Sequence, residues 1–170
     1  LIHQKHPTPD GSEPPIFSQF LGAELVAKEF RVSRRDCDTF SVQSHQMANN
    51  AQKNGYFNNE IVPIEGFDKD GKEIDLVQDE GVRPTASVDG LGKLKPLLED
   101  GVHTAGSASQ ITDGSSCILI MNEAGLRKTG LKPRAKIISV ASSGDDPVIM
   151  LRAPIFSSEK ALKRAGLTPK

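Results

Sequence analysis

The final third of the chain alternates apolar runs with helical patterns, and this alternation constrains the fold more than any other feature. Residues 117–121 (CILIM) form a continuous apolar run typical of a fully buried strand. Asn122 then provides an N-cap for a short helix over residues 123–129, which Gly130 ends. Residues 135–142 (AKIISVAS) predict a second buried strand. A strand, a helix and another strand in this order predict an α/β fold built in layers.

A long helix is predicted in the first third. Ser33 can cap its free N–H groups, an acidic residue follows in the first turn, and Gly55 is a suitable residue to end it after Asn54. Small and apolar residues recur three or four positions apart along this helix. They predict its buried stripe, which consists of Cys37, Phe40, Ser44, Met47, Ala48 and Ala51.

Shorter elements are predicted on either side of this helix. Residues 20–30 (FLGAELVAKEF) follow a helical pattern, and Ser157 caps a final helix that continues through Ala165. Residues 61–64 (IVPI) indicate a short strand, and its proline argues against a central position in a sheet. Residues 68–73 (DKDGKE) predict a polar turn between hairpin strands.

The composition excludes several classes of protein. A formal net charge of −1 argues against broad, non-specific attraction to nucleic acid or to an anionic membrane. No apolar run is long enough to cross a bilayer, and the first residues lack the pattern of a secretion signal. Two cysteines, Cys37 and Cys117, lie far apart without metal-type spacing, so a reducing, cytoplasmic setting is expected.

Six small residues in a row, Thr104 to Ser109, form the most unusual local feature. Such side chains bury little apolar area, so they contribute little to a core. They leave backbone groups accessible to close approach. Two interpretations remain open: a tight turn packed against another element, or a backbone surface against which a slim, polar, extended ligand lies.

No residue forms a convincing catalytic or metal site on physical grounds. Cys37 falls in the predicted helix stripe and Cys117 in a predicted buried strand, whereas a reactive thiolate needs an exposed, electropositive setting. His3 and His6 lie in a proline-rich lead-in without a third ligand in view, so no metal is expected.

Three further polar residues are candidates for a binding site. His45 lies mid-helix, where a hydrogen-bonded structural histidine is expected. His103 precedes the small-residue run and could line a pocket. Arg83 could form a local salt bridge with Asp79 or Glu80, or it could anchor a ligand phosphate, which guanidinium groups pair with well.

Several stretches resemble thiolase motifs, in the order in which that family has them. Residues 33–65 resemble S-R-x-x-x-D-x-F-x-x-x-S-H-x-x-A followed by G-x-F-x-x-E-I-V-P, and DEGVRP (79–84) resembles the D-E-x-x-R-P loop. Residues 93–121 resemble K-L-x-P followed by T-A-G-N-A-S-x-x-x-D-G-A-A-A, and residues 131–155 and 161–168 continue the pattern. Several motifs in the right order are specific, so the chain is identified as a member of the thiolase family.

This resemblance implies an α/β fold that is part of the five-layer αβαβα arrangement of thiolases. After an irregular lead-in (residues 1–19), it assigns residues 20–100 to the loop domain and residues 101–122 to the last strand region of the N-terminal half. Residues 123–170 would open the C-terminal half. A homodimer or tetramer is implied for the full-length protein.

The resemblance also implies acyl transfer between coenzyme A (CoA) and 3-ketoacyl-CoA, by thiolytic cleavage or Claisen condensation, with CoA as substrate and no permanent cofactor. The family's nucleophilic Cys, its G-H-P histidine and its C-x-G cysteine have no match here. The chain is therefore expected to be an internal segment that is inactive alone, and no catalytic residue is assigned. Residues 18–24 (SQFLGAE) lack the His-Met-Gly of some biosynthetic thiolases, which favours a degradative or broad-range relative.

Four residues match family positions that contact CoA. Ser109 and Ala105 would lie beside the pantetheine arm, and Leu98 occupies another position that contacts this arm. Arg83 matches the arginine near the adenine and the phosphates. These four residues are the predicted CoA-binding surface.

A second hypothesis is a non-catalytic, thiolase-like protein of the sterol-carrier type that binds acyl-CoA or lipid. A nucleophilic Cys before Leu1 and a G-H-P histidine after Lys170 would distinguish the enzyme from this binding protein. The sequence leaves the acyl chain length, the direction of the reaction and the oligomeric state open.

Overall fold

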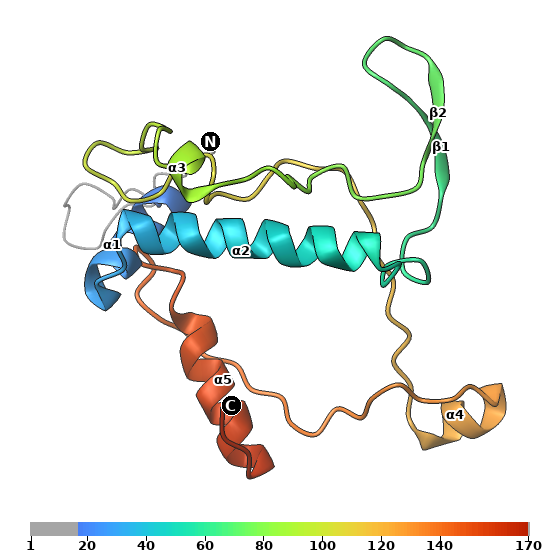
Figure 1. The fold of residues 1–170 in the computed structure, drawn as a ribbon. Coiled ribbons are helices and arrows are strands. Elements are labelled where there is room, and N and C mark those ends of the chain that lie inside the picture. The colour runs from blue at the N-terminus through green and yellow to red at the C-terminus, as the bar shows by residue number, and fades with distance from the viewer. Residues whose placement is uncertain (1–16, 170) are drawn as a thin grey trace. The chain divides into compact units, whose positions relative to one another are not determined.

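The computed structural model describes residues 17–169, which form five helices and one two-stranded sheet (Figure 1). The chain divides into two compact units, one of residues 23–112 and the other of residues 113–169 with the described residues before position 23. Each unit is described by itself. The elements are α1 (Gln19–Phe30), α2 (Arg34–Lys53), β1 (Ile64–Phe67), β2 (Glu73–Leu76), α3 (Val88–Leu91), α4 (Glu123–Thr129) and α5 (Ala153–Ala165).

The predicted long helix is confirmed as α2, and local capping explains both of its ends. The Ser33 hydroxyl accepts the Asp36 N–H at 3.2 Å, while the Asp36 carboxylate accepts the Ser33 N–H at 2.8 Å. This reciprocal pair is a capping box, and the same hydrogen bonds lower the pKa of Asp36. At the other end Asn54 is the C-cap, and Gly55 follows with a φ of 68°, a conformation that favours glycine.

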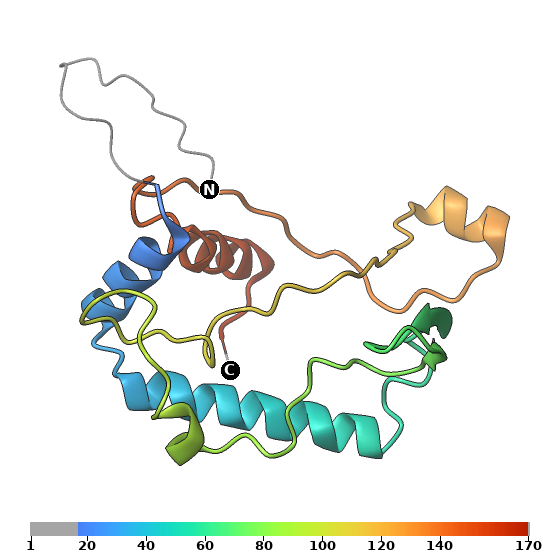
Figure 2. The same ribbon diagram turned by 90° about the horizontal axis from the view of Figure 1, so that it is seen from above.

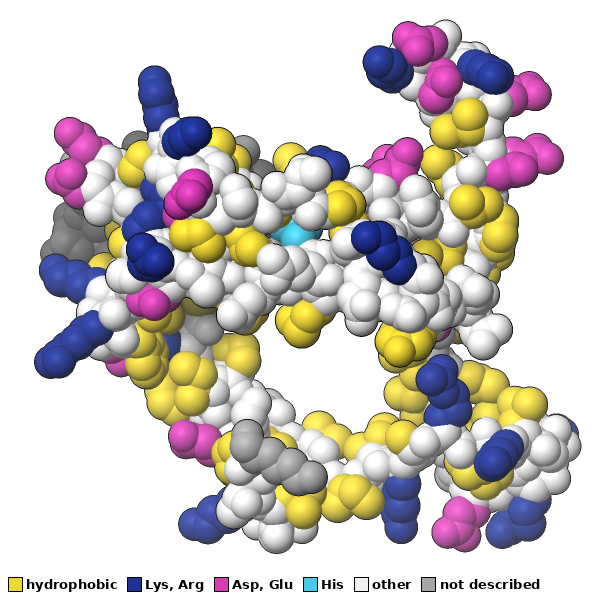
Figure 3. Space-filling model, viewed as in Figure 1, with side chains coloured by type: hydrophobic (Ala, Val, Ile, Leu, Met, Phe, Trp, Pro, Cys, Tyr) yellow, Lys and Arg dark blue, Asp and Glu magenta, His cyan; other side chains and the backbone are white. Residues whose placement is uncertain are grey.

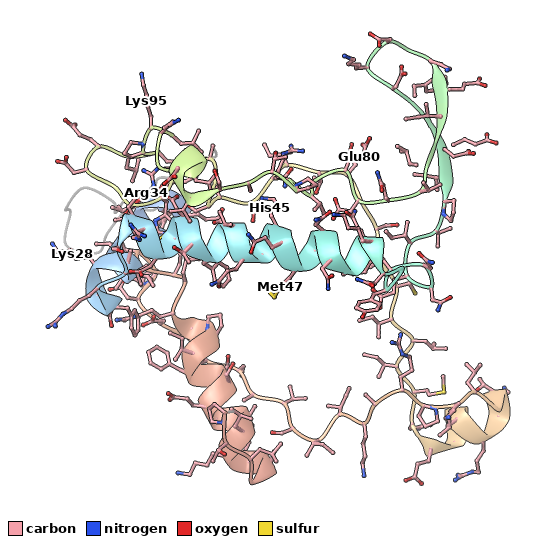
Figure 4. The ribbon with its side chains drawn as sticks, viewed as in Figure 1. Lys28, Arg34, His45, Met47, Glu80 and Lys95 are labelled. Atoms are coloured by element: carbon pink, nitrogen blue, oxygen red, sulfur yellow. The ribbon has the colours of Figure 1, made fainter. Side chains whose placement is uncertain are left out.

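The predicted buried stripe of α2 is wrong. The buried residues of this helix are Asp38 and Val42, whereas Phe40 is 73% exposed and Met47 is 68% exposed. The two views of Figures 1 and 2 place α3 beside the N-terminal half of α2, and it packs there. The buried residues of α2 are therefore those on the side that α3 covers. The spacing of apolar residues along the helix does not show which side this is. Met47 projects away from the loop that carries Glu80 (Figure 4).

The predicted hairpin is confirmed, although its first strand begins later than expected. β1 and β2 pair antiparallel with Ile64 opposite Leu76. The Asp68 carboxylate accepts two N–H groups within the turn, from Asp70 and Lys72, each at 2.9 Å. Residues 61–63 lie outside the strand, because the Ile61 N–H donates back to the Phe57 carbonyl at 3.0 Å and Pro63 has no N–H to donate.

The short helix after Asn122 is confirmed, and the last helix begins earlier than predicted. The Asn122 side chain accepts the Gly125 N–H at 2.9 Å, which starts α4. α5 begins at Ala153, with a proline in its first turn, where no N–H is needed. Ser157 is therefore inside the helix, and its hydroxyl donates to the Ala153 carbonyl at 3.2 Å.

The two predicted buried strands, residues 117–121 and 135–142, are wrong as strands in this structure. Both segments are irregular, and neither pairs with a strand among the described residues. Hydrophobic side chains lie uncovered around α4 in Figure 3. On the segments before and after this helix, six large ones are at least 62% exposed: Ile118, Leu119, Ile120, Ile137, Ile138 and Val140. A strand forms only where another strand pairs with its backbone, so an apolar run alone does not produce one.

Candidate functional site

The loop of residues 79–84 is attached to α2 by side-chain hydrogen bonds. The Gln52 amide donates to the Asp79 carbonyl at 2.8 Å, and the Arg83 N–H donates to Nδ1 of His45 at 3.1 Å. His45 projects from α2 toward the segment that carries Glu80 (Figure 4). Because Nδ1 accepts this hydrogen bond, the imidazole of His45 carries no proton at that atom. The expectation of a hydrogen-bonded structural histidine is confirmed.

The guanidinium of Arg83 lies at the surface and joins this loop to the end of the small-residue run. It donates to the Glu80 carbonyl at 3.2 Å and to the Gln110 side-chain oxygen at 3.5 Å. The Gln110 amide in turn donates to the Gly81 carbonyl at 2.8 Å. The hydrogen-bond partners of the guanidinium are thus neutral oxygens, and the local salt bridge with Asp79 or Glu80 is not formed.

Residues 104–109 form a tight turn around one buried threonine. Thr104 has no exposed surface, and its N–H donates to the Ser107 hydroxyl at 3.0 Å. The Thr104 hydroxyl accepts the Gly106 N–H at 3.0 Å, and its carbonyl accepts the N–H groups of Ser107 and Ala108, each at 3.0 Å. The turn is therefore held by its own hydrogen bonds, and its exposed members remain free to meet a ligand.

Gly106 packs the turn against two leucines of the segment around α3. A Cβ at this position would lie 2.7 Å from Cδ2 of Leu91 and 3.0 Å from Cδ1 of Leu94. Distances below 3.0 Å do not occur for real Cβ atoms, so glycine allows this approach. This is the packed tight turn that the sequence left open as one interpretation.

The four predicted CoA-binding residues occupy the same unit, residues 23–112. Ser109 and Ala105 are exposed on the turn, and Leu98 is half-buried just before it. An isolated antiparallel bridge between Pro96 and Thr104 brings the Leu98 segment alongside the start of the turn. Arg83 is connected to the turn's end through Gln110, as described above. A role in binding CoA stays a prediction.

Sequence reasoning missed Glu24, which holds the residues just before the turn. Its carboxylate accepts the Val102 N–H at 2.9 Å and the His103 N–H at 3.0 Å, and it lies 3.1 Å from Nδ1 of His103. Burial raises the pKa of Glu24, but the hydrogen bonds from Val102 and His103 outweigh burial, so the pKa lies below its ordinary value. His103 is half-buried and paired with this carboxylate, so its exposure as a pocket wall is limited.

Sequence reasoning also missed a buried ion pair at the start of α2. The Arg34 guanidinium lies 2.9 Å from the Asp38 carboxylate, which is buried. The same guanidinium donates to the carbonyls of Leu91 at 2.7 Å and Leu94 at 3.0 Å. Arg34 therefore fixes the backbone of the two leucines that pack against Gly106. The spacing of an Arg and an Asp at i and i+4 was visible in the sequence, but its burial was not.

Cys37 does not have the environment of a nucleophile. Burial, together with the nearby negative charges of Asp38, Glu24 and Asp36, raises the pKa of the Cys37 thiol. This supports a structural role for Cys37. Cys117 is exposed, so the expectation that it is buried is wrong. His3 and His6 lie outside the described residues, and across residues 17–169 no cluster of three or more potential ligands could hold a metal ion.

Alkylation should distinguish the two cysteines. In the 170-residue chain at pH 7.5, iodoacetamide should modify Cys117 several-fold faster than Cys37, because only Cys117 is exposed and the Cys37 thiol resists ionisation. Timed quenching followed by peptide mass spectrometry measures both rates. The denatured chain is the control, and it should lose the difference. Equal rates in the folded chain would contradict the raised pKa of Cys37.

Comparison with known proteins identifies the family. The family model described as "Thiolase, N-terminal domain" matches residues 18–124. The chain belongs to the thiolase family. The resemblance seen in the sequence motifs is thus confirmed. Among the residues that the structure describes, no helix of this thiolase-family chain is long and apolar enough to cross a membrane.

Curated relatives of this thiolase-family chain are considerably longer than the chain. The "3-ketoacyl-CoA thiolase" of Marinomonas sp. (strain MWYL1) is 47% identical over 148 residues, which cover 86% of the chain and 38% of the relative. The protein of the same name from Aliivibrio fischeri is 43% identical over 150 residues, which cover 87% of the chain and 39% of the relative. The chain thus spans less than two fifths of the length of these relatives.

Solved structures give the same assignment for the fold. The Bacillus anthracis acetyl-CoA acetyltransferase matches with a TM-score of 0.81 at 32% identity, over 89% of the chain and 39% of that protein. Human mitochondrial 3-ketoacyl-CoA thiolase matches with a TM-score of 0.76 at 37% identity, over 87% of the chain and 38% of that protein. The fold of the chain is therefore similar to that of the matching part of these two thiolases.

Proposed function

We propose that this chain forms a CoA-binding segment of an acyltransferase of the thiolase type, which transfers acyl groups between CoA and 3-ketoacyl-CoA. The observation that carries the proposal is the turn of residues 104–109, which presents Ala105 and Ser109 to solvent. The relatives named 3-ketoacyl-CoA thiolase support this enzyme class over a non-catalytic acyl-CoA or lipid-binding protein. We propose a degradative or broad-range subclass, which residues 18–24 favour.

The turn suits a thin and partly polar ligand such as the pantetheine arm of CoA. Its backbone is fixed by the buried Thr104, so the exposed small side chains need no reordering when a ligand arrives. Ala105 and Ser109 leave room for close approach, and Ser109 offers a hydroxyl to a ligand amide. Leu98 supplies apolar surface beside the same turn. These features support the arm as the part of CoA that lies here.

Arg83 supports the other end of the same ligand. Its guanidinium is exposed, and its hydrogen bonds go to neutral oxygens, so its positive charge remains available to a phosphate. The loop that carries it is anchored on α2 through His45 and Gln52, which limits the entropy lost on binding. We propose that Arg83 pairs with phosphate groups of CoA near the adenine.

The chemistry of acyl transfer is not assigned to a residue of this chain. Such a reaction needs a thiolate that takes the acyl group, a base that activates it, and donors that stabilise the oxyanion or enolate. Cys37 has a raised pKa, and Cys117 lies in an irregular, exposed segment. We propose that residues of the chain bind and orient CoA, while the catalytic set belongs to other parts of a complete thiolase.

The wider assignments follow from family membership and remain proposals. We propose a five-layer αβαβα fold for the complete protein, in which residues 20–100 belong to the loop domain. Residues 101–122 would end the N-terminal half, and residues 123–170 would open the C-terminal half. A homodimer or tetramer, a cytoplasmic location and CoA as substrate, with no permanently bound cofactor, complete the proposal.

Kinetics of the complete gene product test the site. Arg83→Ala should raise KM for CoA about tenfold, because one hydrogen bond between charged groups contributes roughly 1.5–3 kcal/mol. Ser109→Leu should raise KM for CoA as well, because the larger side chain fills the space proposed for the pantetheine arm. Lys28→Ala is the matched control, since this exposed cation lies on α1 away from the Glu80 loop (Figure 4). Unchanged KM for CoA in both site variants would reject the assignment.

A further inference from the structure

One carboxylate joins α1 to the residues that lead into the turn. Glu24 lies 78 and 79 positions from Val102 and His103 in the sequence, yet it accepts both of their N–H groups. It also pairs with the His103 imidazole, and the side chains of His103 and Glu24 are 24% and 17% exposed. Thr104, the fully buried centre of the turn, directly follows His103 in the sequence. Glu24 thus holds the chain at the position where the turn begins.

The chain around this carboxylate is shaped to admit it. A Cβ on Gly101 would lie 2.6 Å from Oε1 of Glu24 and 3.0 Å from the Leu98 carbonyl oxygen, so a side chain here would displace the carboxylate from its present position. Asp100 has a φ of 58°, a left-handed conformation that is uncommon for residues other than glycine. Such backbone conformations persist only where surrounding contacts hold them in place. The contacts of Glu24 begin two residues after Asp100.

The hydrogen bonds of the cluster favour an ionised carboxylate, in agreement with the lowered pKa of Glu24. All three groups that face Glu24 are nitrogens, and the two backbone nitrogens can only donate. With the carboxylate ionised, Nδ1 of His103 carries the proton and becomes the third donor. This is the opposite tautomer to that of His45, whose Nδ1 accepts a hydrogen bond. Two oxygens of a carboxylate can satisfy three donors, whereas the side chain of glutamine offers a single oxygen and turns its NH2 group toward another donor.

We infer that Glu24 is a positioning residue for the turn of residues 104–109, holding Ala105 and Ser109 in place for CoA through Val102 and His103. The inference rests on the proposed function, because it assigns the hydrogen bonds of Glu24 a role in CoA binding. Glu24 itself need not touch CoA. Loss of the carboxylate would release the residues that lead into the turn. The turn would keep its own hydrogen bonds but would have to be repositioned each time CoA binds.

Hydrogen exchange and CoA kinetics on the complete gene product test this inference together. Glu24→Gln should speed amide exchange in the segment of residues 101–106 by about tenfold or more without CoA, because a local hydrogen-bond cluster opens. It should also raise KM for CoA about fivefold, while kcat stays within about twofold, since the residue acts on binding. His103→Val should have a smaller effect, because both backbone hydrogen bonds remain.

Glu99→Gln is the matched control, since it removes an exposed carboxylate from the same segment. If Glu24→Gln does not accumulate as a folded protein, Gly101→Ala provides the same readouts, because its Cβ would displace the Glu24 carboxylate. Exchange in Glu24→Gln no faster than in Glu99→Gln would overturn the inference, whatever the kinetics. Faster exchange with an unchanged KM for CoA would also overturn it. In that case Ser109→Leu decides separately whether the proposed CoA site stands, so the two failures are distinguishable.

Discussion

Arg34→Ala should destabilise the complete gene product by about 3 kcal/mol, the largest effect of a single side chain that this structure predicts. The substitution leaves the Asp38 carboxylate buried without its ion-pair partner. It also removes two hydrogen bonds to the carbonyls of Leu91 and Leu94. An unpaired buried charge costs more than the pair contributes, because the desolvation of the charge is no longer offset. Chemical denaturation followed by circular dichroism measures the loss.

Two further variants separate charge from packing at this position. Arg35→Ala is the matched control, because its side chain is exposed on the next position of α2 and should change stability by about 0.5 kcal/mol or less. A double replacement of Arg34 and Asp38 by Met and Leu should be less destabilising than Arg34→Ala alone, because it removes both charges together. Equal stability of the Arg34→Ala and Arg35→Ala proteins would show that the buried pair does not stabilise this segment.

Gly106→Val should both destabilise the protein and weaken CoA binding. Its Cβ would meet the ends of the Leu91 and Leu94 side chains at 2.7 and 3.0 Å, and overpacking of this kind costs about 1–3 kcal/mol. The leucine backbones cannot easily retreat, because Arg34 holds both carbonyls. The turn should therefore move instead, which displaces Ala105 and Ser109. We expect a lower Tm and a KM for CoA that rises about tenfold.

A double-mutant cycle tests the steric origin of this effect. Leu91→Ala should partly rescue Gly106→Val, because it removes the nearer methyl group, and the coupling should exceed about 0.5 kcal/mol. Gly114→Val is the matched control, because nothing lies within 4 Å of a Cβ at this position. Strict additivity of Leu91→Ala and Gly106→Val would contradict the proposed contact.

The local parts of this fold were predictable from the sequence because their causes lie within a few residues. The capping box of Ser33 and Asp36, the cap at Asn122 and the polar turn after Asp68 each form from side chains three or four positions apart. α5 is an instructive partial failure. Ser157 was predicted to be the N-cap, but the helix begins earlier, at Ala153. A proline fits in the first turn of a helix, because no N–H is needed there.

The residues of the candidate site also divide into those that the sequence predicted and those that only the structure shows. The small residues of 104–109 and the nearby Arg83 were recognisable from composition and from motifs. Glu24 and Arg34 were not, because their partners lie 78 and 57 positions away in the sequence. A glutamate in a helix and an arginine at i−4 from an aspartate are ordinary surface patterns. Only the folded chain shows that these charges are partly buried, that Glu24 binds the residues before the turn, and that Arg34 binds the backbone of the leucines packed on it.

Sequence by itself therefore determined four of the five helices, the hairpin turn, the thiolase family and the stretch expected to meet CoA, but it did not predict α3. Tertiary structure decided which residues are buried. It exposed Phe40 and Met47 of α2 and buried Asp38, and it left residues 117–121 unpaired. The physical reason is that caps and turns are satisfied by neighbours along the chain. Burial and strand pairing depend on whichever distant segment supplies the covering surface or the second strand.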